Sequence, residues 1–118
     1  MRIRIPKKPV FTNHDTKPGV FVLQKLWQCI VDGNRWIVPD GFEFEITRPR
    51  IWAGSLPDSG AYTEAFLIHD WLYSIKQTSR KYADSVMLAV MKYRGVYKWQ
   101  YRRIYWAIRA FGWLPWRK

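Results

Sequence analysis

Residues 61–73 read AYTEAFLIHDWLY, a mostly apolar and helix-favouring run in which a histidine and an aspartate stand side by side. On a helix, His69 and Tyr73 are four residues apart and share one face, whereas Asp70 is rotated by about 100° from His69. We therefore predict a helix over residues 62–75, which opens the helical half of the chain and carries titratable groups near its carboxyl end.

Two further helices are predicted after this one. The second spans residues 80–93, and the third spans residues 96–111. A side-chain oxygen favours the start of a helix, whereas glycine and proline favour its end. The residues expected to begin, separate and end these helices are Ser79, Gly95, Gly112 and Pro115. The helical half is thus predicted to cover residues 62–112.

The N-terminal half has the pattern of short antiparallel strands. Residues 1–18 are basic and contain three prolines, and only their RIRI stretch alternates like an edge strand before a loop. Residues 20–31 and 35–38 are apolar runs that flank an Asp-Gly pair, a strong hairpin signal because tight reverse turns need positive φ. PDGF at 39–42 is a second turn, and FEFEI at 42–46 alternates as a half-buried strand does.

These two halves define the predicted architecture. The hairpins of residues 20–47 are expected to form one small antiparallel sheet of three or four strands, packed against the three C-terminal helices. Strands first and helices after is the order of an α+β fold. With 118 residues the chain has room for a single domain, residues 1–118, and its apolar fraction of 48% is enough for a core.

Charge and cysteine content narrow the classes of function. Twenty Lys and Arg against nine Asp and Glu give a net charge of +11, which attracts polyanions such as nucleic acid, an anionic membrane face or an acidic partner. The single cysteine, Cys29, excludes an intramolecular disulfide and is expected to be a small core residue. No signal peptide and no transmembrane run of about 18 apolar residues is present, so we expect the protein in the cytoplasm.

A carboxylate interrupts the apolar stripe of the second predicted helix. The stripe follows the spacing i, i+3, i+4 and i+7 and consists of Asp84, Met87, Leu88 and Met91. A buried charge needs a partner, and His69 and Tyr73 on the neighbouring antiparallel helix are the expected ones. A carboxylate bonded to one imidazole nitrogen raises the basicity of the other, which makes a general base for water. Asp70 is expected to hold a hard cation such as Ca²⁺.

The HDWLY motif, followed by an aspartate on the next helix, resembles the catalytic helices of the phospholipase A2 superfamily, whose motif is His-Asp-x-x-Tyr. The resemblance covers two helices and implies a lipid-ester hydrolase. In it, His69 is the catalytic base, Asp84 orients that base, and Tyr73 is a hydrogen-bond partner of Asp84. Asp70 is the calcium ligand that the resemblance implies. The alternative is that the same His-Asp-Tyr cluster is structural and locks the two helices in register.

A longer stretch, from about residue 20 to 112, resembles the domain-of-unknown-function family 1353 of small phage and prophage proteins. The resemblance depends on five segments in a fixed order: WIVPDGF, TRPRIW, GAYTEAFLIHDWLY, ADSVMLAVMKYRGV and YRRIYWAIRAFG. It implies a bacteriophage or prophage context and an uncharacterised activity.

One segment of this family pattern differs here. The family's Thr-Asp-x-x-Ser-x-Pro-Arg reads FEITRPR, which is one residue shorter. Glu45 stands in place of the Asp and Thr47 in place of the Ser, while the final arginine matches as Arg50. Arg50 is expected to complete the His-Asp network by pairing with Asp70 or Asp84.

The third predicted helix has an apolar and a basic side. Its apolar face is expected to contain Tyr97, Tyr101, Ile104, Tyr105, Ile108 and Phe111. Its other side carries a basic stripe with two tryptophans beside it: Lys98, Arg102, Arg109, Trp99 and Trp106. Cations among tryptophans suit an anionic membrane surface or a nucleic-acid strand. The alternative is a packed helix with an ordinary solvated face.

Two hypotheses of function from different classes follow. In the first, a phage-encoded, Ca²⁺-dependent hydrolase acts on lipid esters and docks by its basic side on an anionic membrane surface. In the second, a non-enzymatic phage accessory protein binds a phage or host protein or nucleic acid, and its His-Asp-Tyr cluster is structural. No named nucleic-acid motif is present, so we place nucleic acid behind the other partners. Both hypotheses place the protein in the host cytoplasm, on the virion or at the inner membrane.

Overall fold

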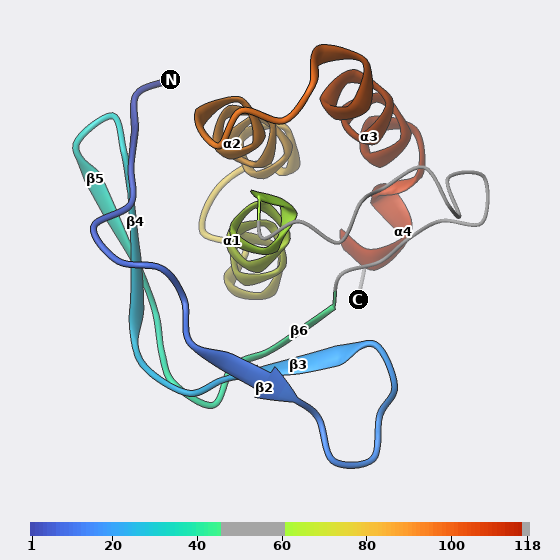
Figure 1. Cartoon of the computed structure of the whole chain (residues 1–118). Coiled ribbons are helices and arrows are strands. Elements are labelled where there is room, and N and C mark those ends of the chain that lie inside the picture. The colour runs from blue at the N-terminus through green and yellow to red at the C-terminus, as the bar shows by residue number, and fades with distance from the viewer. Residues whose placement is uncertain (46–60, 117–118) are drawn as a thin grey trace.

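The computed structural model describes residues 1–45 and 61–116, which form two small antiparallel sheets beside a group of helices (Figure 1). The strands are β1 (Ile3–Arg4), β2 (Phe11–Asn13), β3 (Val20–Leu23), β4 (Trp27–Val31), β5 (Asn34–Val38) and β6 (Glu43–Glu45). The helices are α1 (Ala61–Ile75), α2 (Arg80–Tyr93), α3 (Lys98–Phe111) and α4 (Trp113–Trp116). The predicted α+β class, with strands first and helices after, is confirmed.

The first sheet has the strand order β1-β4-β5 and contains the predicted hairpin. Asp32 and Gly33 connect β4 to β5 with φ angles of 50° and 83°, which is the backbone that a two-residue hairpin turn requires. The RIRI stretch pairs as an edge strand, with Ile3 opposite Val31. The Arg2 N–H also donates to the Asp32 carboxylate at 2.7 Å, which fastens the N-terminal strand to the turn.

The second sheet has the order β2-β3-β6, and the single predicted sheet is therefore wrong. Its strand β2 lies in the segment that was expected to be a loop, and Phe11 pairs with Leu23 of β3. At the second predicted turn, Gly41 has a φ of 82° and its N–H donates to the Leu23 carbonyl at 2.7 Å.

A charged residue explains why the chain leaves one sheet for the other. Leu23 and Trp27 are both buried, so strict alternation between them would also turn Lys25 inward. Burying an unpaired ammonium is costly. Residues 24–26 are exposed instead and separate β3 from β4, which splits the predicted run of residues 20–31 into two strands.

The first helix, α1, is the centre of the core. It contacts β6 on one side and α2 on the other, and in Figure 1 it lies between the sheets and the remaining helices. Four of its side chains have no exposed surface: Ala65, Leu67, Ile68 and Leu72. Strand β4 supplies the facing layer, in which Cys29 is fully buried, as predicted.

The helices α1 and α2 form an antiparallel pair, as predicted. Ser79 begins α2, since its Oγ accepts a hydrogen bond from the Tyr82 N–H at 3.0 Å. The side-chain pairs between the helices run in opposite directions along the chain: Glu64–Arg94, His69–Asp84 and Tyr73–Asp84. This arrangement brings the predicted site residues of both helices together.

The third helix begins two residues later than predicted. Gly95 has a φ of 77°, and Val96 is buried in the connection, so α3 starts at Lys98. Gly112 keeps a right-handed helical backbone, and α4 follows directly. The predicted end of the third helix is confirmed, since α3 ends at Phe111 with Gly112 as its C-cap. The short helix α4 was not predicted, and Pro115 lies in its first turn, where no backbone donor is needed.

The predicted apolar face of α3 is wrong at its two ends. Tyr97 is 70% exposed and Phe111 is 63% exposed. The buried positions of α3 are Gln100 and Ile104. A polar residue is accepted there because the Tyr62 hydroxyl donates a hydrogen bond to Oε1 of Gln100.

Candidate functional site

His69 of α1 and Asp84 of α2 form a buried pair. Nε2 of His69 lies 2.8 Å from Oδ1 of Asp84, and the Tyr73 hydroxyl donates a hydrogen bond to the same oxygen at 2.6 Å. All three residues are buried, and Asp84 is 1% exposed. The expectation that Asp84 finds its partners in His69 and Tyr73 is confirmed as geometry, while the catalytic role of the three residues stays a prediction.

The second oxygen of Asp84 faces two arginines. Nη1 of Arg109, on α3, donates to Oδ2 at 2.7 Å, and Nη1 of Arg80 lies 3.5 Å from the same oxygen. The assignment of Arg109 to the outward basic stripe is therefore wrong. A buried carboxylate is stable only with compensating charge and hydrogen bonds, and the long side chain of Arg109 reaches back to supply both.

These contacts fix the protonation of the site. Burial alone would raise the pKa of Asp84, but hydrogen bonds from His69, Tyr73 and Arg109 bring it below its ordinary value. Burial and the neighbouring Asp84 raise the pKa of Tyr73, which keeps its hydroxyl protonated as a donor. Since ionised Asp84 only accepts, Nε2 of His69 carries the proton of the neutral ring, and no hydrogen bond to Nδ1 comes from the residues that the structure describes.

Asp70 lies on the Nδ1 side of the imidazole. Its Oδ1 is 4.0 Å from Nδ1 of His69, and its Oδ2 accepts a hydrogen bond from the Glu45 backbone N–H at 2.8 Å. Burial raises the pKa of Asp70 to about 6, against the lowering effect of that hydrogen bond and of His69. Strand β6 therefore holds the Asp70 carboxylate in place beside the imidazole.

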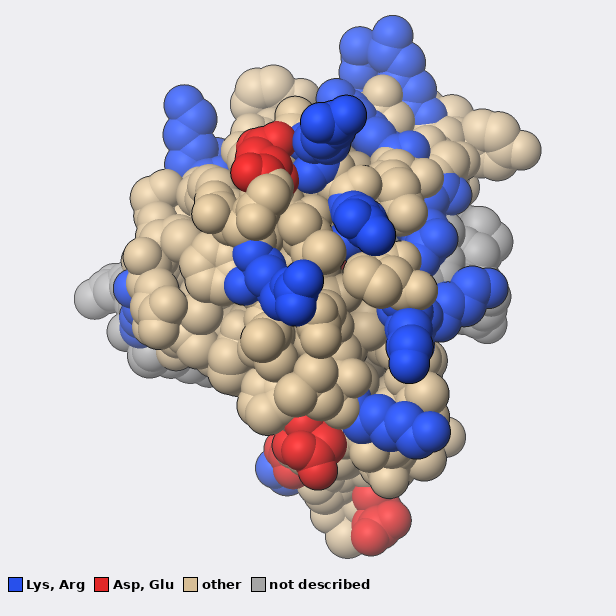
Figure 2. All heavy atoms as spheres, turned by 90° about the vertical axis from the view of Figure 1, so that its left-hand side faces the viewer, with Lys and Arg blue, Asp and Glu red and all other residues tan. Residues whose placement is uncertain are grey.

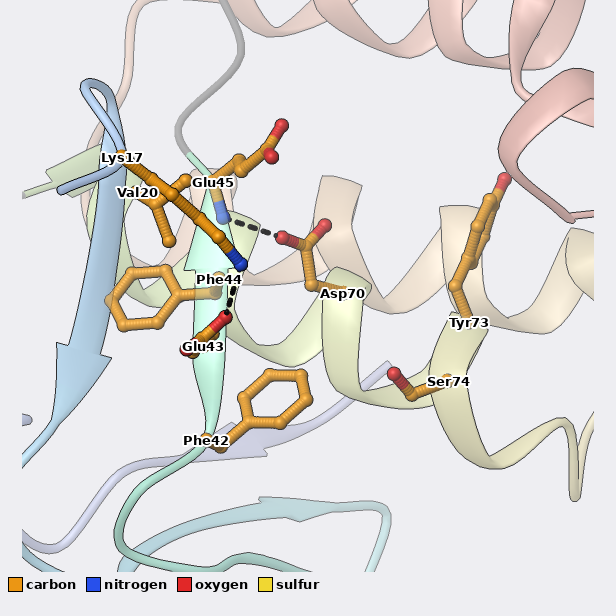
Figure 3. A pocket seen from close by; sticks show the side chains of 9 residues that line it. All are labelled: Lys17, Val20, Phe42, Glu43, Phe44, Glu45, Asp70, Tyr73 and Ser74. Atoms are coloured by element: carbon orange, nitrogen blue, oxygen red, sulfur yellow. Dashed lines mark hydrogen bonds and ion pairs between the residues drawn. The ribbon is translucent and has the colours of Figure 1, made fainter. Parts of the chain in front are cut away.

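A pocket of about 430 Å³ opens beside Asp70, between α1 and the second sheet (Figure 3). In Figure 3 the Asp70 carboxylate points toward β6, with Tyr73 and Ser74 further along α1. The pocket is lined by three apolar side chains, Val20, Phe42 and Phe44, and by the polar residues Lys17, Glu43, Glu45, Asp70, Tyr73 and Ser74. His69 does not line the pocket, and Asp70 lies between its imidazole and the pocket.

The residues expected to support a calcium ion do not form a cluster. Over residues 1–45 and 61–116, no group of three or more His, Cys, Asp and Glu side chains is placed to hold a metal. Among the described residues, the acidic group that acts on Asp70 is Glu45, which contributes its backbone N–H to Asp70 rather than an oxygen. The residues that the structure describes do not gather the six to eight oxygens that Ca²⁺ takes.

Two of the predicted supporting residues, Thr47 and Arg50, lie outside the described residues. The positive partners of Asp84 that the structure does describe are Arg109 and Arg80. Sequence reasoning missed Arg80, although its spacing of i, i+4 from Asp84 was a readable signal. Arg80 also donates to the Ile108 and Arg109 carbonyls at 3.2 Å, so it binds the end of α3 as well.

A second buried ion pair joins the other ends of α1 and α2. Nε and Nη2 of Arg94 donate to the two carboxylate oxygens of Glu64 at 2.5 and 2.7 Å. Glu64 is 3% exposed, and the Glu64 hydrogen bond raises the pKa of Arg94. A bidentate pair of this kind fixes geometry and has no free acid or base, so we interpret it as structural.

The outward side of α3 keeps four of its five predicted surface residues. Lys98 and Arg102 are exposed, and Trp99 and Trp106 are 52% and 68% exposed. Basic residues are also spread widely over the face shown in Figure 2, where few acidic groups appear. Within the part of the chain that the structure describes, no helix is both long and apolar enough to cross a membrane.

Comparison with known proteins gives one match. The model of a family described as "Protein of unknown function (DUF1353)" matches residues 21–108. No curated protein and no solved structure matches the chain. The matched range contains β4 to β6 and α1 and α2 complete, together with most of β3 and of α3, and hence His69, Tyr73 and Asp84.

Proposed function

The chain belongs to the DUF1353 family, and from this premise we propose that its His69–Asp84 pair activates water to hydrolyse a lipid ester. The observation that carries the proposal is the 2.8 Å contact between Nε2 of His69 and Oδ1 of Asp84. Because Asp84 holds the Nε2 proton, the lone pair of Nδ1 is directed to the opposite side of the ring. A histidine oriented in this way has the geometry of a general base.

The proposed reaction needs one water molecule and one ester. Nδ1 of His69 takes a proton from the water as its oxygen bonds to the carbonyl carbon, which leaves a tetrahedral oxyanion and an imidazolium bonded to Asp84. The bond between the carbonyl carbon and the alcohol oxygen then breaks, and Nδ1 returns the proton to that oxygen. The products are a carboxylic acid and an alcohol, and His69 is neutral again.

The other site residues have positioning roles in this proposal. Tyr73 and Arg109 hold the Asp84 carboxylate, and the lowered pKa of Asp84 keeps it ionised through the cycle. The pocket beside Asp70 offers apolar contact from Phe42 and Phe44, which suits the acyl part of a lipid ester. Whether hydrolysis depends on Ca²⁺ is measured separately, by assays with added Ca²⁺ and with a chelator.

The test is hydrolysis of a soluble, short-chain phospholipid by the full chain, with Ca²⁺ or with a chelator. We expect His69→Gln to lower the rate by at least about 10²-fold, the contribution of a general base. His14→Gln is the matched control, because His14 is the other histidine of the chain and does not contact Asp84. Absence of turnover by the wild type in both conditions, or equal rates for the wild type and His69→Gln, contradicts the proposal.

The hydrogen bonds and ion pairs of Asp84 also favour a second candidate function, in which the site is structural. Its two oxygens contact His69, Tyr73, Arg80 and Arg109 from three helices, as a purely structural network also would. In this case the protein is a non-enzymatic phage accessory protein that binds a phage or host protein. No turnover, together with a large loss of thermal stability in His69→Gln, selects this candidate. Both candidates place a phage-encoded protein in the host cytoplasm or at the inner membrane.

A further inference from the structure

The outward face of α3 carries a row of tryptophans and arginines. Trp99, Arg103 and Trp106 are spaced by four and three residues, so they lie on one side of the helix. Arg102 lies beside them, and the guanidinium of Arg103 is 5.6 Å from the Trp99 ring centroid. Trp113, at the start of α4, extends the spacing and is 45% exposed.

This row is the side of α3 that faces away from the core. The packed side of the helix holds Gln100 and Ile104, whereas Trp106 is 68% exposed and Trp99 is 52% exposed. Burial of an indole is strongly favourable, and its N–H also suits an environment that is apolar at one end and wet at the other. Two large rings left half in water on one helix therefore mark an interaction surface.

We infer that this face of α3, defined by Trp99, Arg102, Arg103 and Trp106, docks the protein on an anionic lipid bilayer. The indoles insert at the level of the headgroups, and the arginines bind lipid phosphates. The overall charge of +11 draws the protein toward such a surface. Charge is spread over other faces as well, as Figure 2 shows, so the exposed rings and not the charge alone select α3.

A bilayer fits this face better than a nucleic-acid strand does. Proteins that bind single strands combine stacking rings with a groove that follows the phosphates. The row on α3 lies along one convex helix, and neither the pocket beside Asp70 nor the one between β1 and α2 includes a residue of α3. A flat anionic surface contacts all four side chains at once.

The docking face is joined to the His-Asp site through the same helix. Arg109 of α3 binds Asp84, and Arg80 of α2 donates to the carbonyls of Ile108 and Arg109. The helix that carries the docking face is therefore in direct contact with the His69–Asp84 pair. Docking of this kind rests on the proposed hydrolysis for its purpose, since it would supply the lipid partner. Binding to vesicles does not require hydrolysis, so it is measured with the variant His69→Gln.

The experiment is co-sedimentation of full-length His69→Gln with vesicles of phosphatidylcholine alone, or of equal parts phosphatidylcholine and phosphatidylglycerol. We expect binding to the anionic vesicles only. Adding Arg102→Gln and Arg103→Gln should lower the partition coefficient about 25-fold, at about fivefold per charge. The control with the same net charge is Lys25→Gln with Arg35→Gln, two exposed residues of the strand half, and it should lose less.

The tryptophans are tested by Trp99→Ser with Trp106→Ser against Leu26→Ser with Ile37→Ser, two apolar residues that are 55% and 45% exposed. Only the α3 pair should abolish binding. Equal losses in the α3 and control variants overturn the inference, as does tighter binding to single-stranded DNA, or a dimer that Trp106→Ser dissociates. Hydrolysis of a soluble ester is unaffected by these outcomes, so failure of docking and failure of the proposed reaction are distinguishable.

Discussion

Gly112 and Tyr73 approach so closely that a Cβ atom on Gly112 would lie 2.7 Å from the Tyr73 hydroxyl oxygen. The backbone of Gly112 is ordinary for any residue, with φ −67° and ψ −12°, so the glycine is needed for space and not for conformation. The same hydroxyl donates to Asp84. The end of α3 therefore limits where the Tyr73 side chain lies, and through it the position of the Asp84 carboxylate.

Gly112→Ala should destabilise the fold by about 1–3 kcal/mol, the usual cost of forcing an atom into a packed site. Urea denaturation measures this difference. A Cβ at Gly112 would also clash with the Ile108 carbonyl oxygen, so Tyr73→Phe relieves only one of its close contacts. The double variant should therefore lose somewhat less than the sum of the two single variants. Strictly additive effects would show that the two residues do not limit each other.

Asp84→Asn should lower the free energy of unfolding by about 3–5 kcal/mol, because it leaves Arg109 and Arg80 facing a neutral amide in a buried site. The variant keeps the size of the side chain, so the loss reports charge rather than packing. Asp40→Asn is the control, since Asp40 is exposed, and should change stability by less than about 0.5 kcal/mol. Similar effects of the two substitutions would contradict a buried ionised network.

Stability should depend on pH through Asp70. The pKa of Asp70 is about 6 in the folded protein against an ordinary value of 3.8. Between these values the folded state binds more protons than the unfolded state, so the free energy of unfolding falls as pH rises from about 4 to 6. Because the side chain is 32% exposed, we expect a fall on the order of 1 kcal/mol.

Asp70→Asn removes this titration, so the difference in stability between Asp70→Asn and the wild type should grow over that pH range. Urea denaturation with a chelator present measures it. Parallel pH profiles for the two proteins would disprove the raised pKa. Asp84 contributes in another pH range. Because its pKa is lowered in the folded protein, it adds stability above the ordinary value of 3.8, and this stability is lost as the pH falls further.

The Glu64–Arg94 pair should behave as a unit. Arg94→Gln leaves the nearly buried Glu64 carboxylate without its cation and should cost about 3 kcal/mol or more. Glu64→Gln combined with Arg94→Gln removes both charges and should recover part of this loss, as a double-mutant cycle would measure. The exposed pair of Lys17 and Glu43 should show a coupling below about 1 kcal/mol, and equal coupling in the two pairs would refute the difference in burial.

The core of the site was predictable because it depends on helix spacing. The i, i+4 relation of His69 and Tyr73, and the position of Asp84 on an apolar stripe, indicated that two antiparallel helices bring these side chains together. Arg109 was not predictable in the same way. Its Cα belongs to the polar side of α3, and only the packing of three helices shows that its long side chain turns back to Asp84.

The strand half was predictable in its turns but not in its pairing. Asp-Gly and Pro-Asp-Gly mark turns by local chemistry. The division into two sheets depends instead on which strands pair, and these strands are far apart in the sequence. Strand β2 is an example, because its three residues have little pattern of their own and exist as a strand only through pairing with β3. That Lys25 divides the apolar run of residues 20–31 could be predicted from the sequence only by assuming that both Leu23 and Trp27 are buried.

Sharing one carboxylate among four side chains has a consequence for the history of this family. Substituting Asp84 alone passes through a protein with buried, uncompensated arginines, and substituting Arg109 alone passes through one with an under-compensated carboxylate. Each of these single substitutions lowers the stability of the fold, which disfavours it during evolution. Across related chains, the positions of His69, Asp84 and Arg109 should therefore change together or not at all.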